Sequence, residues 1–221
     1  MINLQIDDQG TIWQSDETWL DSWHWRWMPS DAQGSSGSKG ARQTIDGLEA
    51  VRHVYAQKNT RKIPVGIIGP NEPDADMLKA AELLGAKLAE LNVPILCGGR
   101  GGVMEAASRG AFLQGGLTMG FLRGDDWRDA NDYISIPLAT GIGHARNALI
   151  AQGSQALVAV GGQYGTHSEA AFGLVFGKQV FGLCHAPDID GVQHKESVEA
   201  VLEALVPVLL HLPASTKSDA S

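Results

Sequence analysis

The chain has 221 residues, of which 43% are hydrophobic, so it is long enough to bury one sizeable core and to carry a smaller appendage. Its 17 Lys and Arg residues against 25 Asp and Glu residues give a net charge of −8, which disfavours binding to nucleic acid, whose phosphates select basic surfaces. No apolar stretch approaches the roughly 20 residues of a membrane-spanning helix, and the first ten residues lack the pattern of a signal peptide, so we expect a cytoplasmic protein with no nucleic-acid and no membrane partner.

Residues 1–60 differ in character from the rest and are predicted to form the appendage. The segments INLQID and GTIWQ flank the turn-forming sequence Asp8-Gln9-Gly10, which predicts a β-hairpin. Residues 31–40 are rich in Gly and Ser, as in flexible linkers, and the apolar spacing from 45 to 57 predicts a short amphipathic helix. Five of the six tryptophans lie within residues 13–27: Trp13 in the second strand of this hairpin, and Trp19, Trp23, Trp25 and Trp27 between the hairpin and the linker.

The tryptophan-rich segment is predicted to be an extended arm. Trp23, Trp25 and Trp27 alternate with polar residues, and a period of two places three indoles on one face of an extended strand. Because such a face is rarely left exposed on a monomer, it either packs on the chain's own α/β core or reaches a second subunit. We predict a homo-oligomer, a dimer or a tetramer, in which the arm contributes to an interface or covers the ligand cleft.

From residue 61 to residue 213, short apolar runs alternate with helical periodicity. Strands are predicted at 63–69, 93–99, 117–122, 133–138, 156–162 and 179–184. Helices are predicted at 74–91, 103–114, 143–152 and 167–177, with a closing helix near 195–210. This alternation is typical of a mostly parallel sheet covered by helices on both faces. The predicted fold class is therefore α/β, a Rossmann-like, doubly wound domain of six to seven strands, followed by a flexible tail at 214–221.

Glycine-rich loops follow three of the predicted strands. Ligands in such sheets bind outside the carboxyl ends of the strands, and glycines and helix N-termini allow backbone N–H groups to approach an anion. We therefore expect a phosphate-binding cleft there, and packing turns in an ordinary α/β sheet are the alternative interpretation. The candidate ligand- and phosphate-binding residues are Gly69, Gly98, Gly99, Arg100, Gly101, Gly102, Gly161, Gly162, Gln163, Tyr164, Gly165 and Thr166.

Two charged residues complete the candidate site. Arg146 lies near the start of an otherwise apolar helix, where it is either a surface residue or a bidentate ligand for a phosphate or carboxylate. Glu169 lies in the first turn of another helix, where the helix dipole favours a carboxylate whatever its function. If both groups serve one cleft, they should lie within about 10 Å of each other. His144 and His167 are interpreted as incidental loop residues.

The stretch from about Pro64 to Leu183 resembles the LOG-type proteins, long mislabelled lysine decarboxylases. It is still more similar to a DprA/Smf-related branch that includes molybdenum-cofactor carrier proteins, on the segments GGRGGVMEAASRGA and TGIGHARNALI. The LOG signature P-G-G-x-G-T-x-x-E is matched by GGQYGTHSE, except that Gly161 replaces the proline and Gln163 replaces the second glycine. The resemblance implies that the family's catalytic glutamate falls on Glu169 and its catalytic arginine on Arg146.

The resemblance implies two alternative functions for one ligand-binding site. In the first, the chain hydrolyses the N-glycosidic bond of a nucleoside 5′-monophosphate, with Glu169 stabilising positive charge on the ribose or activating water and Arg146 orienting the ligand. In the second, it is a non-catalytic carrier for the molybdenum cofactor or a related phosphorylated pterin. A third class would make the tryptophan-rich arm an interaction device on an inert core.

No resident cofactor is required in any of these readings, and the molybdenum cofactor is expected only as a carried ligand. Lysine decarboxylation is excluded because the core strands and loops offer no lysine for a Schiff base with pyridoxal phosphate. No metal site and no disulfide are predicted, because Cys97 and Cys184 lie in or beside apolar runs, as buried free thiols do. The expected partner is therefore a small phosphorylated molecule.

Overall fold

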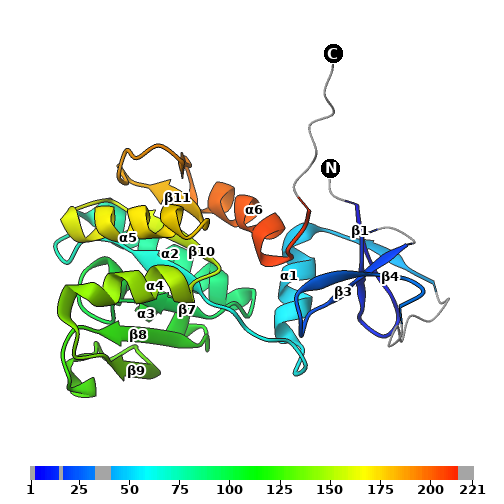
Figure 1. Cartoon of the computed structure of the whole chain (residues 1–221), viewed down its shortest axis with the longest axis horizontal. Helices are drawn as coiled ribbons and strands as arrows, with labels where there is room; N and C mark the ends of the chain where they lie inside the picture. Colours follow the sequence, from blue (N-terminus) through cyan, green and yellow to red (C-terminus); the bar gives the residue numbers. More distant parts are fainter. Residues whose placement is uncertain (1–2, 15–16, 33–40, 214–221) are drawn as a thin grey trace, which may run out of the picture. The chain divides into compact units, whose positions relative to one another are not determined.

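A computed structural model describes residues 3–14, 17–32 and 41–213. The chain divides into two compact units, each with its own sheet (Figure 1). One unit is Lys62–Glu203, and the other comprises Met1–Arg61 together with Ala204–Ser221. Within the described residues, no helix is both long and apolar enough to cross a membrane.

The Lys62–Glu203 unit is built on a seven-stranded sheet in the order β12-β11-β10-β6-β7-β8-β9. Every neighbouring pair in this sheet is parallel. The strands are β6 Val65–Ile68, β7 Ile95–Cys97, β8 Thr118–Leu122, β9 Ile136–Ala139, β10 Ala156–Val160, β11 Gln179–Leu183 and β12 Val192–His194. The four central strands are nearly all buried because helices cover both faces, so the predicted Rossmann-like α/β fold is confirmed.

Two helices lie on each face of this sheet. Helices α2 (Ala75–Glu90) and α3 (Val103–Leu113) pack together on one face. Helices α4 (Arg146–Gly153) and α5 (Tyr164–Val175) pack together on the other and stand in front of the sheet in Figure 1. The chain runs outward from β6 through β7 to β9, then returns and runs from β10 to β12 in the opposite direction. Strand order therefore reverses between the neighbours β6 and β10, where doubly wound sheets bind ligands.

Most predicted elements differ from the structure by one to three residues in their bounds, as three examples show. The strand expected at 133–138 is β9, Ile136–Ala139, because Tyr133 and Ser135 are held by hydrogen bonds to Thr118 before the strand begins. The helix expected at 143–152 begins as the 3-10 turn η2, Gly143–Ala145. The helix expected at 167–177 begins earlier, at Tyr164, so the glycine-rich segment before it is partly helical. Strand β12 was not predicted, since its sequence VQH is polar and lies at the sheet edge.

The other unit contains a five-stranded antiparallel sheet in the order β4-β3-β2-β1-β5 and the helix α1 (Gly47–Ala56). Its strands are β1 Leu4–Ile6, β2 Ile12–Trp13, β3 Thr18–Asp21, β4 Arg26–Pro29 and β5 Gln43–Ile45. Strands β1 and β2 flank the Asp8–Gly10 turn, as the sequence predicts. The Asp7 carboxylate fixes this turn by accepting hydrogen bonds from the Gln9 and Thr11 N–H groups and from the Trp13 indole.

The tryptophan-rich segment is a hairpin of this sheet, so the prediction of an extended arm with three indoles on one face is wrong. The Asp21 carboxylate accepts hydrogen bonds from the Trp23 and His24 N–H groups and turns the chain between β3 and β4. As a result Trp23 is 46% exposed, whereas Trp25 is buried with a positive φ of 53°. The Trp25 ring stacks on His211 of the same unit.

Residues Ala204–Leu210 group with the N-terminal unit, although the sequence analysis assigned all of 61–213 to the Rossmann-like domain. They belong to the end of α6 (Val198–Leu209) and its last turn. The Trp27 indole N–H donates a hydrogen bond of 3.0 Å to the Leu210 carbonyl, which ties this segment to the hairpin. Most of the predicted Gly/Ser linker (33–40) and the predicted tail (214–221) lie outside the described residues, and the homo-oligomer remains a prediction.

Candidate functional site

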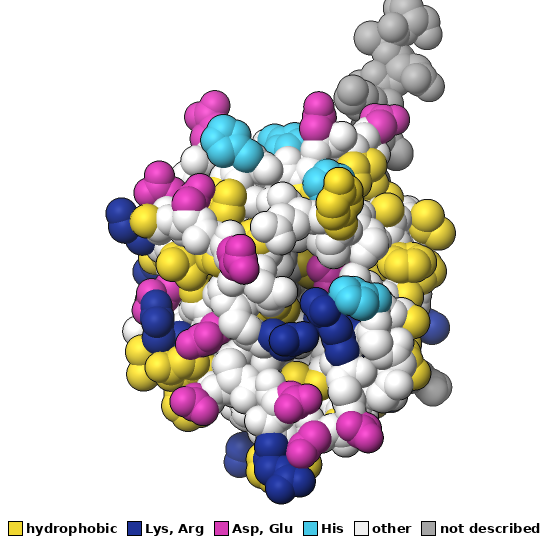
Figure 2. All heavy atoms as spheres, turned by 90° about the vertical axis from the view of Figure 1, so that its left-hand side faces the viewer, with side chains coloured by type: hydrophobic (Ala, Val, Ile, Leu, Met, Phe, Trp, Pro, Cys, Tyr) yellow, Lys and Arg dark blue, Asp and Glu magenta, His cyan; other side chains and the backbone are white. Residues whose placement is uncertain are grey.

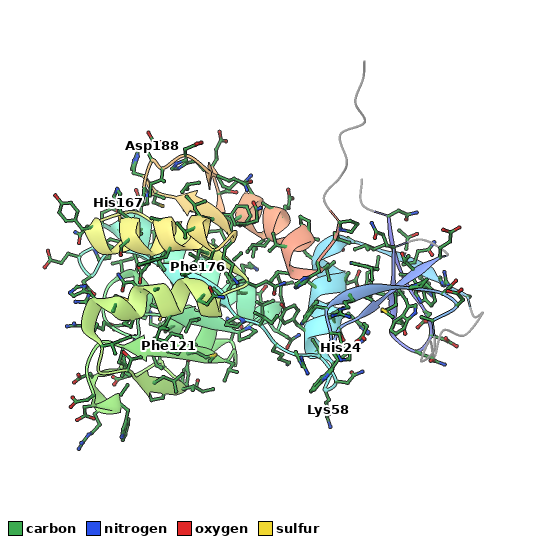
Figure 3. The ribbon with its side chains drawn as sticks, viewed as in Figure 1. His24, Lys58, Phe121, His167, Phe176 and Asp188 are labelled. Carbon is green, nitrogen blue, oxygen red and sulfur yellow. The ribbon has the colours of Figure 1, made fainter. Side chains whose placement is uncertain are left out.

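A cavity of about 730 Å³ lies at the carboxyl ends of β6 and β10, at the reversal of strand order. Its walls come from the loops after β6, β8 and β10 and from the starts of α4 and α5. His167, near the first turn of α5, marks this end of the unit in Figure 3, and Phe176 marks the opposite end of that helix. The volume falls in the range of about 300–1,000 Å³ that small-molecule sites occupy.

A buried ion pair forms the base of the cavity. The Arg146 Nη1 atom donates hydrogen bonds of 2.7 Å to Glu169 Oε1 and of 2.7 Å to Asn147 Oδ1. The two charged side chains are therefore in direct contact, well inside the separation of about 10 Å that the sequence analysis expected. Asn147 is held in turn, because its Nδ2 atom donates to Ser168 Oγ. Both α4 and α5 thus contribute to one polar network.

Gly98 provides the space for this arginine. A Cβ atom added at Gly98 would lie 2.2 Å from Nη2 of Arg146 and 2.7 Å from Sδ of Met104. The guanidinium therefore packs directly against the backbone that follows β7. The absence of a side chain at Gly98 positions Arg146, a different role from the phosphate contact that the sequence analysis assigned to it.

Burial dominates the electrostatics of the carboxylate. Desolvation raises the pKa of Glu169 from its ordinary 4.5 to about 7, although the charge and hydrogen bond of Arg146 and the charge of Arg123 lower it. Burial also lowers the pKa of Arg123, and the nearby positive charges of Arg146 and Arg100 lower it further. Three guanidinium groups therefore share one region of an acidic chain.

Several buried donors at the cavity have no partner within the described structure. The Nε atoms of Arg146 and Arg123 and the hydroxyl of Thr166 are all buried without a hydrogen bond. The N-cap residue of α5, Gln163, makes no side-chain cap, so the first backbone N–H groups of this helix, whose residues line the cavity, have no capping partner. Uncapped helix N-termini and guanidinium groups both favour an anion. The arrangement is therefore suited to binding a phosphate.

Most of the predicted site residues line this cavity, and some do not. Those that line it are Gly69, Arg146, Gly162, Gln163, Tyr164, Gly165, Thr166 and Glu169. Those that lie outside its lining are Gly98, Gly99, Arg100, Gly101, Gly102 and Gly161. Gly102 and Gly161 have positive φ values of 68° and 65°, so they serve tight turns. Arg100 lines a smaller cavity next to Arg123.

Sequence reasoning missed part of the lining, namely Pro70, Asn71, Met104, Arg123 and Asn147. His144 and His167, interpreted as incidental, also line the cavity. Arg123 carried a usable signal, because it directly follows a predicted strand whose carboxyl end faces the site. His144 is tied to it, with Nε2 3.1 Å from Nη1 of Arg123.

Comparison with known proteins gives relatives that match about two thirds of this chain. An uncharacterized protein of Archaeoglobus fulgidus is 42% identical over 136 residues, which are 61% of this chain and 89% of that protein. The molybdenum cofactor binding protein of the phototrophic bacterium Rippkaea orientalis is 33% identical, with a TM-score of 0.64, over 67% of this chain and 98% of that chain. The molybdenum cofactor carrier protein of Chlamydomonas reinhardtii is 34% identical, with a TM-score of 0.62, over 67% of this chain and 99% of that chain.

A more distant likeness agrees with the resemblance drawn from the sequence. DNA processing protein A of Streptococcus pneumoniae is 18% identical, with a TM-score of 0.53, over 64% of this chain and 61% of that chain, and this likeness concerns the fold alone. The model of the SLOG cluster4 family matches residues 62–208, about two thirds of the sequence. The chain therefore belongs to the SLOG cluster4 family.

Proposed function

We propose that this protein is a carrier that binds the molybdenum cofactor, or a related phosphorylated pterin, and releases it chemically unchanged. The observation that carries the proposal is the cavity at the β6–β10 reversal, whose buried donors are suited to an anion. The two solved proteins named for the molybdenum cofactor support it, because their similarity to this chain covers almost their whole length.

The residues present fit such a cargo. The phosphate of the ligand would accept hydrogen bonds from the first N–H groups of α5 and from the Thr166 hydroxyl, which is buried and unpartnered. Arg123 would supply the charge, since Arg146 is already paired with Glu169. Tyr164 lines the cavity and is 96% exposed, so its ring is free to stack on a flat pterin at the entrance.

The state of Glu169 favours carriage over turnover. A carboxylate that acts on a ribose has to reach the reacting carbon, but the Oε1 atom of Glu169 is engaged by Arg146 at 2.7 Å. Arg146 in turn is fixed between Gly98 and Asn147. The pair therefore behaves as a rigid floor of the cavity, and binding does not require it to open.

The direct test is to identify the small molecule that leaves the freshly purified, denatured protein by mass spectrometry, with molybdenum measured in parallel. The Arg123→Ala variant should lose the molecule, because it removes the uncompensated charge. The Arg128→Ala variant is the matched control: it removes the same charge from an exposed side chain that pairs with Asp126 outside the cavity. Recovery of no pterin from a molybdenum-replete host would contradict the proposal.

A second candidate function is hydrolysis of a nucleoside 5′-monophosphate, in which water adds to C1′ of the ribose and the base departs. One observation favours it: the pKa of Glu169 is raised to about 7 by burial, within the range of a general acid or base at neutral pH. Incubation with AMP, followed by assay for free adenine and ribose 5-phosphate, tests this function. Turnover that Glu169→Gln lowers by about 10²-fold or more, with little change in affinity, would establish it.

A further inference from the structure

A second, smaller cavity adjoins the site just described. It has a volume of about 200 Å³ and is lined by Arg100, Leu122, Arg123, Gly124 and Asp129. Arg123 lines both this cavity and the larger one, so a cationic side chain separates the two. A space of this size has room for a phosphate group.

The charges around the small cavity are not balanced. Its lining contains two basic residues, Arg100 and Arg123, and one acidic residue, Asp129. Among the described residues no salt bridge involves Arg100 or Arg123, whereas Arg146 is paired with Glu169. Figure 2 shows Lys and Arg side chains gathered beside a hollow near the middle of one face, with acidic side chains distributed around them.

Arg123 is placed between the two spaces in an electrostatically costly position. Its Nε atom is buried without a hydrogen-bond partner, and the only partner of its Nη1 atom in the described structure is the ring of His144. Burial and the charges of Arg146 and Arg100 together lower its pKa, with the charge of Glu169 opposing them. An anion bound on both sides of this guanidinium would relieve the repulsion and satisfy the buried donor.

We propose that the site takes a ligand with two linked phosphates, the diphosphate-bridged class to which dinucleotide forms of a pterin belong, in preference to a monophosphate. One phosphate lies on the α5 N-terminus with Thr166, and the second lies between Arg123 and Arg100. This inference rests on the proposed function, because it concerns the cargo of the same cavity. It accounts for Arg100, which the sequence analysis assigned to phosphate binding and which lies outside the lining of the larger cavity.

The test compares ligands that differ only in the second phosphate. Calorimetry of the full-length protein is performed with inorganic phosphate against pyrophosphate, and with AMP against ADP. We expect the diphosphate member of each pair to bind at least about tenfold more tightly, equivalent to one strong charged contact. Arg100→Ala should reduce this preference to about one, and since Arg100 is exposed its loss should not disturb the fold. Arg128→Ala should keep the preference.

The outcomes separate this inference from the proposed function. Equal affinity for both members of each pair overturns the diphosphate assignment and leaves a monophosphate carrier. A preference that survives in Arg100→Ala also overturns it, because the second phosphate would then lie elsewhere. Failure of all four probes to bind, together with purification free of any pterin, overturns the proposed function itself. A melting temperature for each variant confirms that lost binding is not lost folding.

Discussion

Replacing Gly98 with alanine tests whether the absence of a side chain at this position is needed to accommodate the Arg146 guanidinium. The new Cβ atom would stand 2.2 Å from Arg146 Nη2, whereas ordinary contact begins at 3.4 Å, so the guanidinium has to retreat by about 1.2 Å, the difference between these distances. Because the guanidinium is rigid and planar, Nη1 moves with Nη2. The 2.7 Å hydrogen bond from Nη1 to Glu169 is then stretched beyond bonding distance or broken.

The expected magnitude follows from two costs. Overpacking a well-packed interior costs about 1–3 kcal/mol, and full rupture of a buried ion pair costs about 3–5 kcal/mol. Since the pair at Gly98 is displaced but its members remain present, we expect a loss of about 2–4 kcal/mol in the free energy of unfolding. For a protein of this size that corresponds to a fall of about 4–16 °C in melting temperature. Affinity for phosphate should fall as well, because Arg146 forms the floor of the cavity.

The matched control is Gly101→Ala in the same loop. A Cβ atom there would meet only Glu105 Oε2, at 3.7 Å, and the backbone at Gly101 does not have a left-handed φ. We expect its stability to stay within about 0.5 kcal/mol of the parent protein. Urea denaturation followed by circular dichroism, with calorimetric binding of phosphate, measures both effects. Similar losses in the two variants would refute the reasoning, because the loop would then need glycine for a reason unrelated to Arg146.

Three further predictions concern single side chains. Folding raises the pKa of Glu169 from 4.5 to about 7, so its ionisation opposes folding. The free energy of unfolding of the parent, relative to that of Glu169→Gln, should therefore fall by about 3 kcal/mol as the pH rises from 4.5 to 7, at about 1.4 kcal/mol per pKa unit. A difference in urea melts that does not change with pH would contradict this. Thr166→Val removes a buried unpartnered hydroxyl, so the ligand-free variant should be as stable as the parent or about 1 kcal/mol more stable. Its affinity for phosphate, measured by calorimetry, should be about tenfold weaker. Unchanged affinity would mean that the hydroxyl does not contact the ligand. Trp27→Phe removes the indole hydrogen bond to the Leu210 carbonyl and should lower the free energy of unfolding, measured by thermal unfolding, by about 1 kcal/mol. Its affinity for phosphate should be unchanged, and a loss of phosphate binding would contradict this prediction.

The sheet could be predicted because its strands are buried on both faces. Apolar runs such as VGII and ALVAV, separated by helical patterns, indicate strands of a parallel sheet that is covered on both faces. Strand β12 escaped prediction for the opposite reason: an edge strand needs backbone pairing on one side only, so its sequence VQH carries no apolar signature. The hairpin at Trp23 escaped because one carboxylate, that of Asp21, turns a segment whose alternation is otherwise typical of an extended strand.

Some residues of the candidate site could be predicted from the sequence and others could not. Arg146 and Glu169 could be singled out because the sequence places both near predicted helix starts at the end of the sheet where ligands bind. Arg146 does open α4, but α5 begins at Tyr164, so Glu169 lies in its second turn and not in the first turn that the sequence predicted. The role of Gly98 could not, because it depends on a guanidinium that arrives from a helix far along the chain. Arg123 was overlooked because the charged loop that contains it reads as an ordinary solvated turn. Its importance comes from sharing two cavities, which only the folded chain reveals.

The backbone of the signature loop gives a reason why this chain departs from the LOG pattern. At the position of the signature proline, Gly161 has a φ of +65°, and a proline ring fixes φ near −65°, so this turn is closed to proline. A Cβ atom there would also lie 2.5 Å from Sδ of Met77. At the position of the second glycine, Gln163 has an extended backbone, with φ −134° and ψ −180°, which any residue can adopt. The change to Gln163 therefore causes no backbone strain, and it places an amide side chain in the lining of the cavity. The change to Gly161 indicates a turn into α5 whose shape differs from one that contains proline. The altered loop shape and the Arg146–Glu169 pair, whose two members bind each other directly, both support the carrier function that we propose.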